Sequence, residues 1–160
     1  MELLTRRLRL VLQTREEVLA AIAAMSPGDQ AQVSPDWLAR LHASPESDPW
    51  SRSFGMVHRE TGEVVGSCSF KGPPLDGAVE IAYAVAPEMQ GQGFATEAAE
   101  GLFDFASSFA EVRVVRAHTL PTTSASTRVL AKCQFTHVGE VIDPEDGPVW
   151  RFERTVTPPA

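Results

Sequence analysis

The sequence is poor in several features, and the shortage of cysteines and of long apolar runs excludes several classes of protein. It contains no asparagine, only two cysteines, and no apolar run near the ~20 residues that a membrane-spanning helix needs. The N-terminus also lacks the basic and then apolar pattern of a secretory signal. Cys68 and Cys133 are too few for a disulfide framework, and we expect both to be small buried residues rather than nucleophiles or metal ligands. We therefore expect a soluble, cytoplasmic protein with no membrane partner and no metal.

Basic charge is scarce as well. The chain has 14 Lys and Arg residues against 21 Asp and Glu residues, which gives a net charge of −7. Nucleic acid is therefore not expected as a partner, because phosphate backbones recruit basic surfaces. A cationic acceptor suits this charge better. With 160 residues, of which 43% are hydrophobic, the chain should form one domain over residues 1–157, followed by a frayed tail at 158–160.

Hydrophobic periodicity predicts an α/β domain. Helices are expected at 16–25, from 94 to about 109, and at 125–133, while the proline-punctuated stretch 26–53 should form loops and short helices. Strand patterns recur through the chain, and the three between 54 and 85 should form an antiparallel meander. The expected strands are 8–12, 54–59, 64–71, 79–85 and 112–120, with a closing hairpin of 135–141 and 149–154.

Two spaced glycines, Gly91 and Gly93, separate a strand pattern from an amphipathic helix that starts near Phe94. Glycines allow a tight turn, and a helix N-terminus offers free N–H donors with the positive end of its dipole, so this segment can bind a pyrophosphate. A P-loop would need Lys followed by Ser or Thr after its last glycine, where this chain has Phe94 and Ala95. A dinucleotide fingerprint would need a third Gly or Ala at Thr96.

What the segment resembles is the acetyl-coenzyme A pyrophosphate motif of the GCN5-related N-acetyltransferase (GNAT) superfamily. That motif is Gln or Arg, two residues, Gly, one residue, and Gly or Ala, and Gln90, Gly93 and Ala95 fill it in order. Further stretches resemble the ribosomal-protein-alanine acetyltransferase-like branch and occur in the order expected of it. They are residues 5–10, 62–67, 80–83, 116–121 and 125–135.

The resemblance implies a fold and a set of cosubstrate contacts. The implied fold is the GNAT fold, with a mostly antiparallel mixed sheet flanked by helices and a V-shaped cleft between strands 4 and 5. The implied cosubstrate is acetyl-CoA, whose pantetheine arm would pair with backbone near Val85 and whose pyrophosphate would be held by the N–H groups of residues 90–96. Gln90 either bonds a phosphate oxygen or is a solvated loop residue. The implied cofactor-binding residues are Val85, Gln90, Gly91, Gln92, Gly93, Phe94, Ala95, Thr96 and Ser124.

The implied reaction is transfer of acetyl from a thioester to a primary amine, by direct attack within a ternary complex. Only a neutral amine attacks. A lysine-like amine with a pKa of ~10.4 is less than about a thousandth neutral at pH 7, whereas an α-amine with a pKa of ~8 is about a tenth neutral. The enzyme therefore gains by accepting a proton and by offering N–H donors to the developing oxyanion.

Candidate acid–base residues follow from the same resemblance. The branch often carries a catalytic glutamate where this chain has Glu80, which otherwise would lie on the solvent face of its strand. Ser126 is the candidate acid that returns a proton to the coenzyme A thiolate, and its alternative role is a helix N-cap. If the acid is a tyrosine, Tyr83 is the one candidate. His118 either orients an acceptor and relays a proton, or only packs.

The chain departs from the branch at two positions. Ser124 stands where the branch usually has Asn, so one cosubstrate contact should be weaker or run through water. Gln134 stands where the branch usually has Gly, in a left-handed helix end, which should cost stability rather than activity.

The acceptor amine is not readable from the sequence, and both a protein N-terminus and a small molecule are compatible with it. A different class of function is also open, namely a non-catalytic acyl-CoA-binding module of the same fold. The sequence allows either a monomer or a homodimer.

Overall fold

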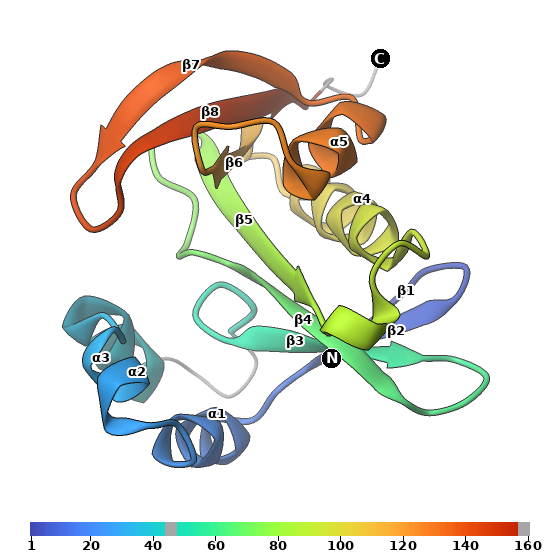
Figure 1. Ribbon diagram of the computed structural model, residues 1–160, viewed down its shortest axis with the longest axis vertical. Coiled ribbons are helices and arrows are strands. Elements are labelled where there is room, and N and C mark those ends of the chain that lie inside the picture. The colour runs from blue at the N-terminus through green and yellow to red at the C-terminus, as the bar shows by residue number, and fades with distance from the viewer. Residues whose placement is uncertain (44–47, 157–160) are drawn as a thin grey trace.

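The strands of the protein form one sheet, and its helices lie in the connections between them (Figure 1). The structure is a computed structural model that describes residues 1–43 and 48–156, apart from the side chain of Arg40, so the tail expected at 158–160 lies outside the described residues. The strands are β1 (Glu2–Leu4), β2 (Leu8–Leu12), β3 (Ser53–His58), β4 (Val64–Phe70), β5 (Ala78–Val85), β6 (Val114–Thr119), β7 (Thr136–Asp143) and β8 (Gly147–Thr155). The helices are α1 (Arg15–Ala23), α2 (Pro27–Ala31), α3 (Pro35–Ala43), the 3-10 turn η1 (Pro87–Met89), α4 (Phe94–Ser107) and α5 (Ala125–Lys132).

The sheet has eight strands in the order β1-β2-β3-β4-β5-β6-β8-β7. Strands β1 to β5 pair antiparallel with their neighbours, as do β6 with β8 and β8 with β7. Within the described residues, β5 and β6 form the one parallel pair. The mostly antiparallel mixed sheet, the meander between residues 54 and 85 and the α/β class are therefore confirmed.

Strands β5 and β6 pair over a short distance and then separate. Their paired residues run only from Ala78–Val114 to Glu80–Arg116, although β5 continues to Val85 and β6 continues to Thr119. Beyond Glu80 the facing edges of the two strands have no sheet partner in the part of the chain that the structure describes. This is the predicted V-shaped cleft, and it lies between the fifth and sixth strands because β1, which the sequence pattern did not reveal, adds a strand before it.

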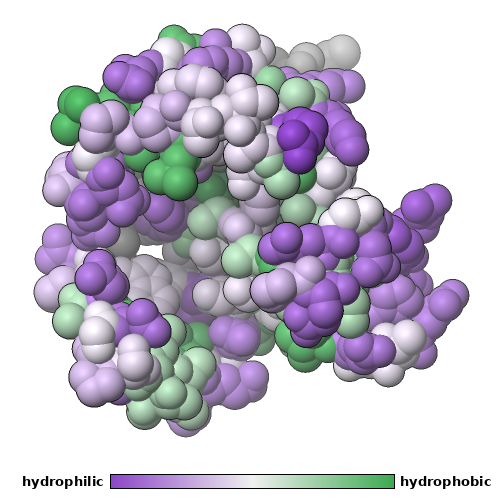
Figure 2. Space-filling model, viewed as in Figure 1, coloured by the Kyte–Doolittle hydropathy of each residue, from purple (hydrophilic) through white to green (hydrophobic). Residues whose placement is uncertain are grey.

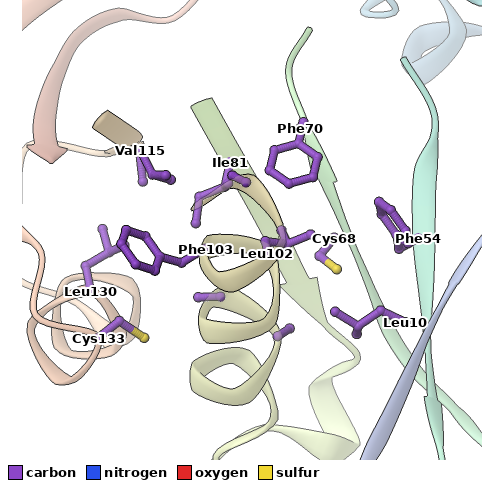
Figure 3. Close-up of a cluster of buried hydrophobic side chains, with 14 of the residues drawn as sticks. Leu10, Phe54, Cys68, Phe70, Ile81, Leu102, Phe103, Val115, Leu130 and Cys133 are labelled. Atoms are coloured by element: carbon purple, nitrogen blue, oxygen red, sulfur yellow. The ribbon is translucent and has the colours of Figure 1, made fainter. Parts of the chain in front are cut away.

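The hydrophobic core lies between the sheet and α4. On α4, Ala98, Leu102 and Ala106 are fully buried, as the spacing of its apolar residues predicts. Figure 3 shows Leu102 near the strands and Phe103 directed toward Leu130 of α5. This packing fixes α4 rigidly against β5 and α5, which sets the direction of its N-terminus.

Both cysteines are buried in this core. Burial raises the pKa of the Cys68 thiol to about 12. Burial, with the nearby charge of Glu100, does the same to Cys133. Both thiols therefore stay protonated at neutral pH, and the expectation that both cysteines are buried is confirmed.

Helices α1–α3 lie on one side of the sheet and α4 and α5 lie on the other (Figure 1). The helix predicted at 16–25 is α1, and the stretch 26–53 contains two short helices, α2 and α3. Among the described residues, no helix combines the length and apolar character that crossing a membrane requires.

Candidate cosubstrate site

The turn before α4 has the backbone conformation that its glycines predict. Gly91 has φ of 77° and Gly93 has φ of 85°, both in the left-handed region that residues with a Cβ avoid. Gly93 is the N-cap of α4. The chain thus reverses direction within a few residues of the end of β5, which brings the first turn of α4 beside the open cleft.

Most of the N–H groups in this turn have no acceptor among the described residues. The first helical hydrogen bond of α4 runs from the N–H of Glu97 to the carbonyl of Gly93 (3.1 Å), and the structure shows no acceptor for the N–H groups of residues 91–96 within the residues it describes. By contrast, the N–H of Gln90 donates to Pro87. Unpaired N–H groups combined with the positive end of a helix dipole favour a bound anion.

All of the residues that carry these donors except Gln92 line a pocket of about 350 Å³. The pocket is formed by the end of β5, the glycine turn, the first turn of α4 and one side of α5. Its volume is typical of small-molecule sites. Most of the residues predicted to bind a cosubstrate line it, whereas Gln92 and Ser124 do not. The predicted residues that line it are Val85, Gln90, Gly91, Gly93, Phe94, Ala95, Thr96 and Ser126.

Two of the predicted contact residues bond to each other. The side-chain amide of Gln90 donates to the carbonyl of Val85 (3.1 Å). Gln90 therefore satisfies a backbone acceptor at the free end of β5 and is more than a solvated loop residue.

The two serines at the start of α5, Ser124 and Ser126, have different roles in the structure. Ser124 is the N-cap, in a reciprocal capping box with Thr127, so the alternative role of Ser126 as the cap is wrong. Ser126 lines the pocket, and its carbonyl accepts a hydrogen bond from the hydroxyl of Tyr83 (3.3 Å). Burial raises the pKa of Tyr83, so that this hydroxyl keeps its proton at neutral pH. Besides Thr96, the pocket lining therefore contains two candidate proton donors, the hydroxyl groups of Ser126 and Tyr83.

Glu80 lies outside this pocket, at the point where β5 and β6 separate. Its neighbours in the strand, Val79 and Ile81, are buried in the core, so the Glu80 side chain lies on the opposite face of the sheet. There Oε2 of Glu80 is 3.3 Å from Nζ of Lys71 and 3.0 Å from Nδ1 of His118. The carboxylate is thus ion-paired and only a quarter exposed, so it is not the fully solvated side chain that the alternative from the sequence describes.

His118 is fixed from its other side. Nε of Arg151 donates to Nε2 of His118 (3.0 Å), which makes Nε2 an acceptor. In a neutral ring the proton then sits on Nδ1, the nitrogen that faces Glu80. Arg151 therefore favours the tautomer whose Nδ1–H lies on the Glu80 side of the ring, although the 3.0 Å contact with Glu80 does not have the angle of a hydrogen bond and Nδ1 has no other hydrogen-bond partner among the described residues.

An ion pair that the sequence did not reveal supports the glycine turn at residues 90–93, which is the predicted pyrophosphate turn. Glu97, in the first turn of α4, accepts hydrogen bonds from the Thr5 hydroxyl, from the Arg7 backbone and from Nε of Arg7 (2.8 Å). Burial acts to raise the pKa of Glu97, but these hydrogen bonds and the Arg7 charge outweigh it and lower the pKa. The Arg7 guanidinium also lies 4.6 Å from the centre of the Phe94 ring. This contact ties the N-terminal end of α4 to the chain between β1 and β2.

Comparison with known proteins assigns the family. The family model described as acetyltransferase (GNAT) domain matches residues 7–136. The chain belongs to this family. The superfamily expected from the pyrophosphate motif is therefore confirmed.

Individual relatives of this GNAT domain are distant. An uncharacterized N-acetyltransferase, p20, of Bacillus licheniformis is 30% identical over 93 residues, 58% of this chain and 52% of that protein, so the chain spans about half the length of the curated relative that it matches. A ribosomal-protein-S5-alanine acetyltransferase from Vibrio fischeri is similar in fold, with a TM-score of 0.70, 14% identity and coverage of 98% and 97% of the two chains. A spermidine N-acetyltransferase from Vibrio cholerae, solved with CoA and spermine, has a TM-score of 0.68, 16% identity and coverage of 94% and 96%.

Proposed function

We propose that this GNAT domain transfers acetyl from acetyl-CoA to a primary amine. The observation that carries the proposal is the row of N–H groups at residues 91–96, which have no acceptors in the described part of the chain and, apart from that of Gln92, belong to residues that line a pocket beside the open β5–β6 cleft. A diphosphate needs several such donors at a helix N-terminus. The relatives are consistent with this, since one solved neighbour was crystallised with CoA.

In this proposal the backbone of β5 holds the pantetheine arm. The free edge of β5 runs from Ile81 to Val85 along the cleft and offers peptide groups without a sheet partner. The hydrogen bond from Gln90 to the Val85 carbonyl occupies one of these groups, so the Gln90 side chain must rotate away when an amide of the arm pairs there. The arm would lead from the pyrophosphate turn toward Glu80.

Glu80 is the proposed base. It is the last residue of β5 that pairs with β6, so it lies where the cleft between these strands begins. Figure 2 shows the surface hollowed between the part formed by α1–α3 and the part that contains the β7–β8 hairpin, and an amine can approach through this hollow. Glu80 accepts a proton from the ammonium group, and His118 holds the carboxylate in place.

Ser126 is the proposed acid, because its side chain belongs to the pocket that would hold the thiol. Tyr83 is the competing donor, since its protonated hydroxyl is 3.3 Å from the Ser126 carbonyl. The variants Ser126→Ala and Tyr83→Phe each remove one hydroxyl. We expect Ser126→Ala to lower kcat by about 100-fold and Tyr83→Phe to change it much less, with thiol release as the assay.

The base assignment is tested by Glu80→Gln. This variant should lower kcat by about 100-fold while the Kd for acetyl-CoA stays within about twofold of wild type. Glu153→Gln is the matched control, because Glu153 is a comparably exposed carboxylate in the same sheet that pairs with Arg116 (2.7 Å) and does not line the pocket. Wild-type turnover in Glu80→Gln would refute the role. Binding of acetyl-CoA by the wild type without turnover of any amine would instead indicate the acyl-CoA-binding module.

The acceptor is proposed only as a primary amine. The solved neighbours include enzymes named for ribosomal-protein alanine and for spermidine, two acceptors that share an amine and little else. A thiol-release screen with one panel of N-terminal peptides and one panel of small amines separates the two classes. Activity confined to one panel identifies the class.

A further inference from the structure

The wall of the pocket opposite the pyrophosphate turn is formed by α5, and it carries two positive charges. Arg128 and Lys132 are four residues apart on this helix, so they lie on the same side of it, and both line the pocket. They are the charged residues of the pocket lining within the described part of the chain. Figure 1 shows α5 beside α4 on one side of the sheet, and the pocket that both cations line is also lined by Gly91 and residues 93–96.

Within the described residues, no side chain neutralises either cation. Both residues are exposed, and among the described residues the structure shows no ion pair and no hydrogen bond from either side chain. Arg7 differs, since its charge is matched by Glu97 (2.8 Å) on the far side of the turn. In a protein with a net charge of −7, two unmatched cations in one pocket indicate an anionic ligand.

The N–H groups of residues 91–96 do not complete the charge balance. Backbone dipoles at a helix N-terminus act as roughly half a positive charge, which does not balance the negative charge of a diphosphate. Coenzyme A also carries a phosphate monoester on its ribose, which a single row of amides cannot reach while it holds the diphosphate. Side chains with full positive charge are therefore required near the turn.

We propose that Arg128 and Lys132 are cosubstrate-binding residues that hold a phosphate group of coenzyme A across the pocket from the amides. This inference rests on the proposed use of acetyl-CoA. Both the diphosphate and the ribose 3′-phosphate present the same chemistry to a guanidinium and an ammonium group. Comparing acetyl-CoA with 3′-dephospho-acetyl-CoA distinguishes these two sources.

The test is the double variant Arg128→Ala/Lys132→Ala, measured by calorimetry with both ligands and by steady-state kinetics. We expect the Kd and KM for acetyl-CoA to rise by about 25-fold, since two charge-assisted contacts at a partly exposed site contribute about a factor of five each. The kcat at saturating cosubstrate should stay within about twofold. Added salt should weaken wild-type binding more than binding by the variant, because screening acts on these charges.

The matched control is Arg9→Ala/Arg113→Ala, which removes two exposed positive charges outside the pocket. It should bind acetyl-CoA as the wild type does. Circular dichroism checks that both double variants are folded, and Arg128→Lys/Lys132→Arg should retain most of the affinity.

Each outcome decides the inference. A loss of affinity for acetyl-CoA alone identifies the 3′-phosphate as the group bound, and an equal loss for both ligands identifies the diphosphate. An unchanged Kd in the folded double variant, with tight binding by the wild type, refutes the role of Arg128 and Lys132 and leaves the proposed function intact. Failure of the wild type itself to bind acetyl-CoA would refute the proposed function and this inference together.

Discussion

Replacing Gly93 by alanine should damage the pyrophosphate turn more than the same change at Gly91. Both residues have positive φ, so a Cβ at either costs about 1–2 kcal/mol in backbone strain. Alanine also restricts the unfolded chain, which returns about 0.4–1 kcal/mol. The two substitutions should therefore each lower the free energy of unfolding by about 1 kcal/mol from backbone effects alone.

The surroundings of the two glycines separate them. A Cβ at Gly91 meets nothing within 4 Å, whereas a Cβ at Gly93 lies 3.1 Å from Nη2 of Arg7. Arg7 cannot move freely, because Glu97 and the Phe94 ring hold it. Gly93→Ala must therefore shift the first turn of α4 or the guanidinium, at an added cost of about 0.5–1 kcal/mol.

Calorimetry with acetyl-CoA and thermal unfolding measure both effects. Gly93→Ala should weaken binding at least about tenfold, or about 1.4 kcal/mol, because its strain falls on the amides of the first helical turn. Gly91→Ala should weaken it about threefold. Gln92→Ala is the control, since Gln92 is exposed and does not line the pocket. If Gly93→Ala loses stability as expected yet binds as the wild type does, the amides do not hold the ligand.

Three further predictions concern stability and are checked by denaturant unfolding. Glu97→Gln should lower the free energy of unfolding by about 2 kcal/mol at neutral pH by weakening the bonds from Thr5 and Arg7. The pKa of Glu97 in the folded protein lies below its usual value of 4.5, so the difference in unfolding free energy between wild type and variant should shrink as the pH falls through 4.5 and below. A difference that does not change with pH would contradict the ion pair. Ser124→Ala should cost about 1 kcal/mol through the lost cap of α5, and no loss would show that the capping box is not formed in solution. Gln134→Gly should add about 0.5–1 kcal/mol, because residue 134 has φ of 65°, and a destabilised variant would contradict that conformation.

The backbone turns were the part of the fold that the sequence predicted best. Glycine at 91 and 93 and a helix start at Phe94 are local signals, since left-handed φ and a helix N-terminus depend on adjacent residues. The left-handed end of α5 at Gln134 was likewise expected and is confirmed. Strand β1 was missed because three residues are too few to show periodicity.

The site was harder to predict where it depends on residues distant in sequence. No pattern joins Arg7 to Glu97, or Glu80 to Lys71 and His118, because these contacts arise only when strands pair in one register. Glu80 was chosen by family resemblance, and its surroundings could not be read from the strand alone.

One further signal for the pocket is present in the sequence. Arg128 and Lys132 are spaced four apart on a predicted helix, which places two cations on one face. The direction of that face depends on how α5 packs against α4, and only the structure supplies it.

Backbone amide NMR of the ¹⁵N-labelled protein during titration with acetyl-CoA tests the central claim most directly, since it observes the proposed donors themselves. The account predicts that the amide signals of residues 91–96 shift downfield as they gain phosphate acceptors, and by more than the signals of α1 and α2. Saturable binding that leaves these signals in place while others shift would contradict the account, as would the absence of any binding.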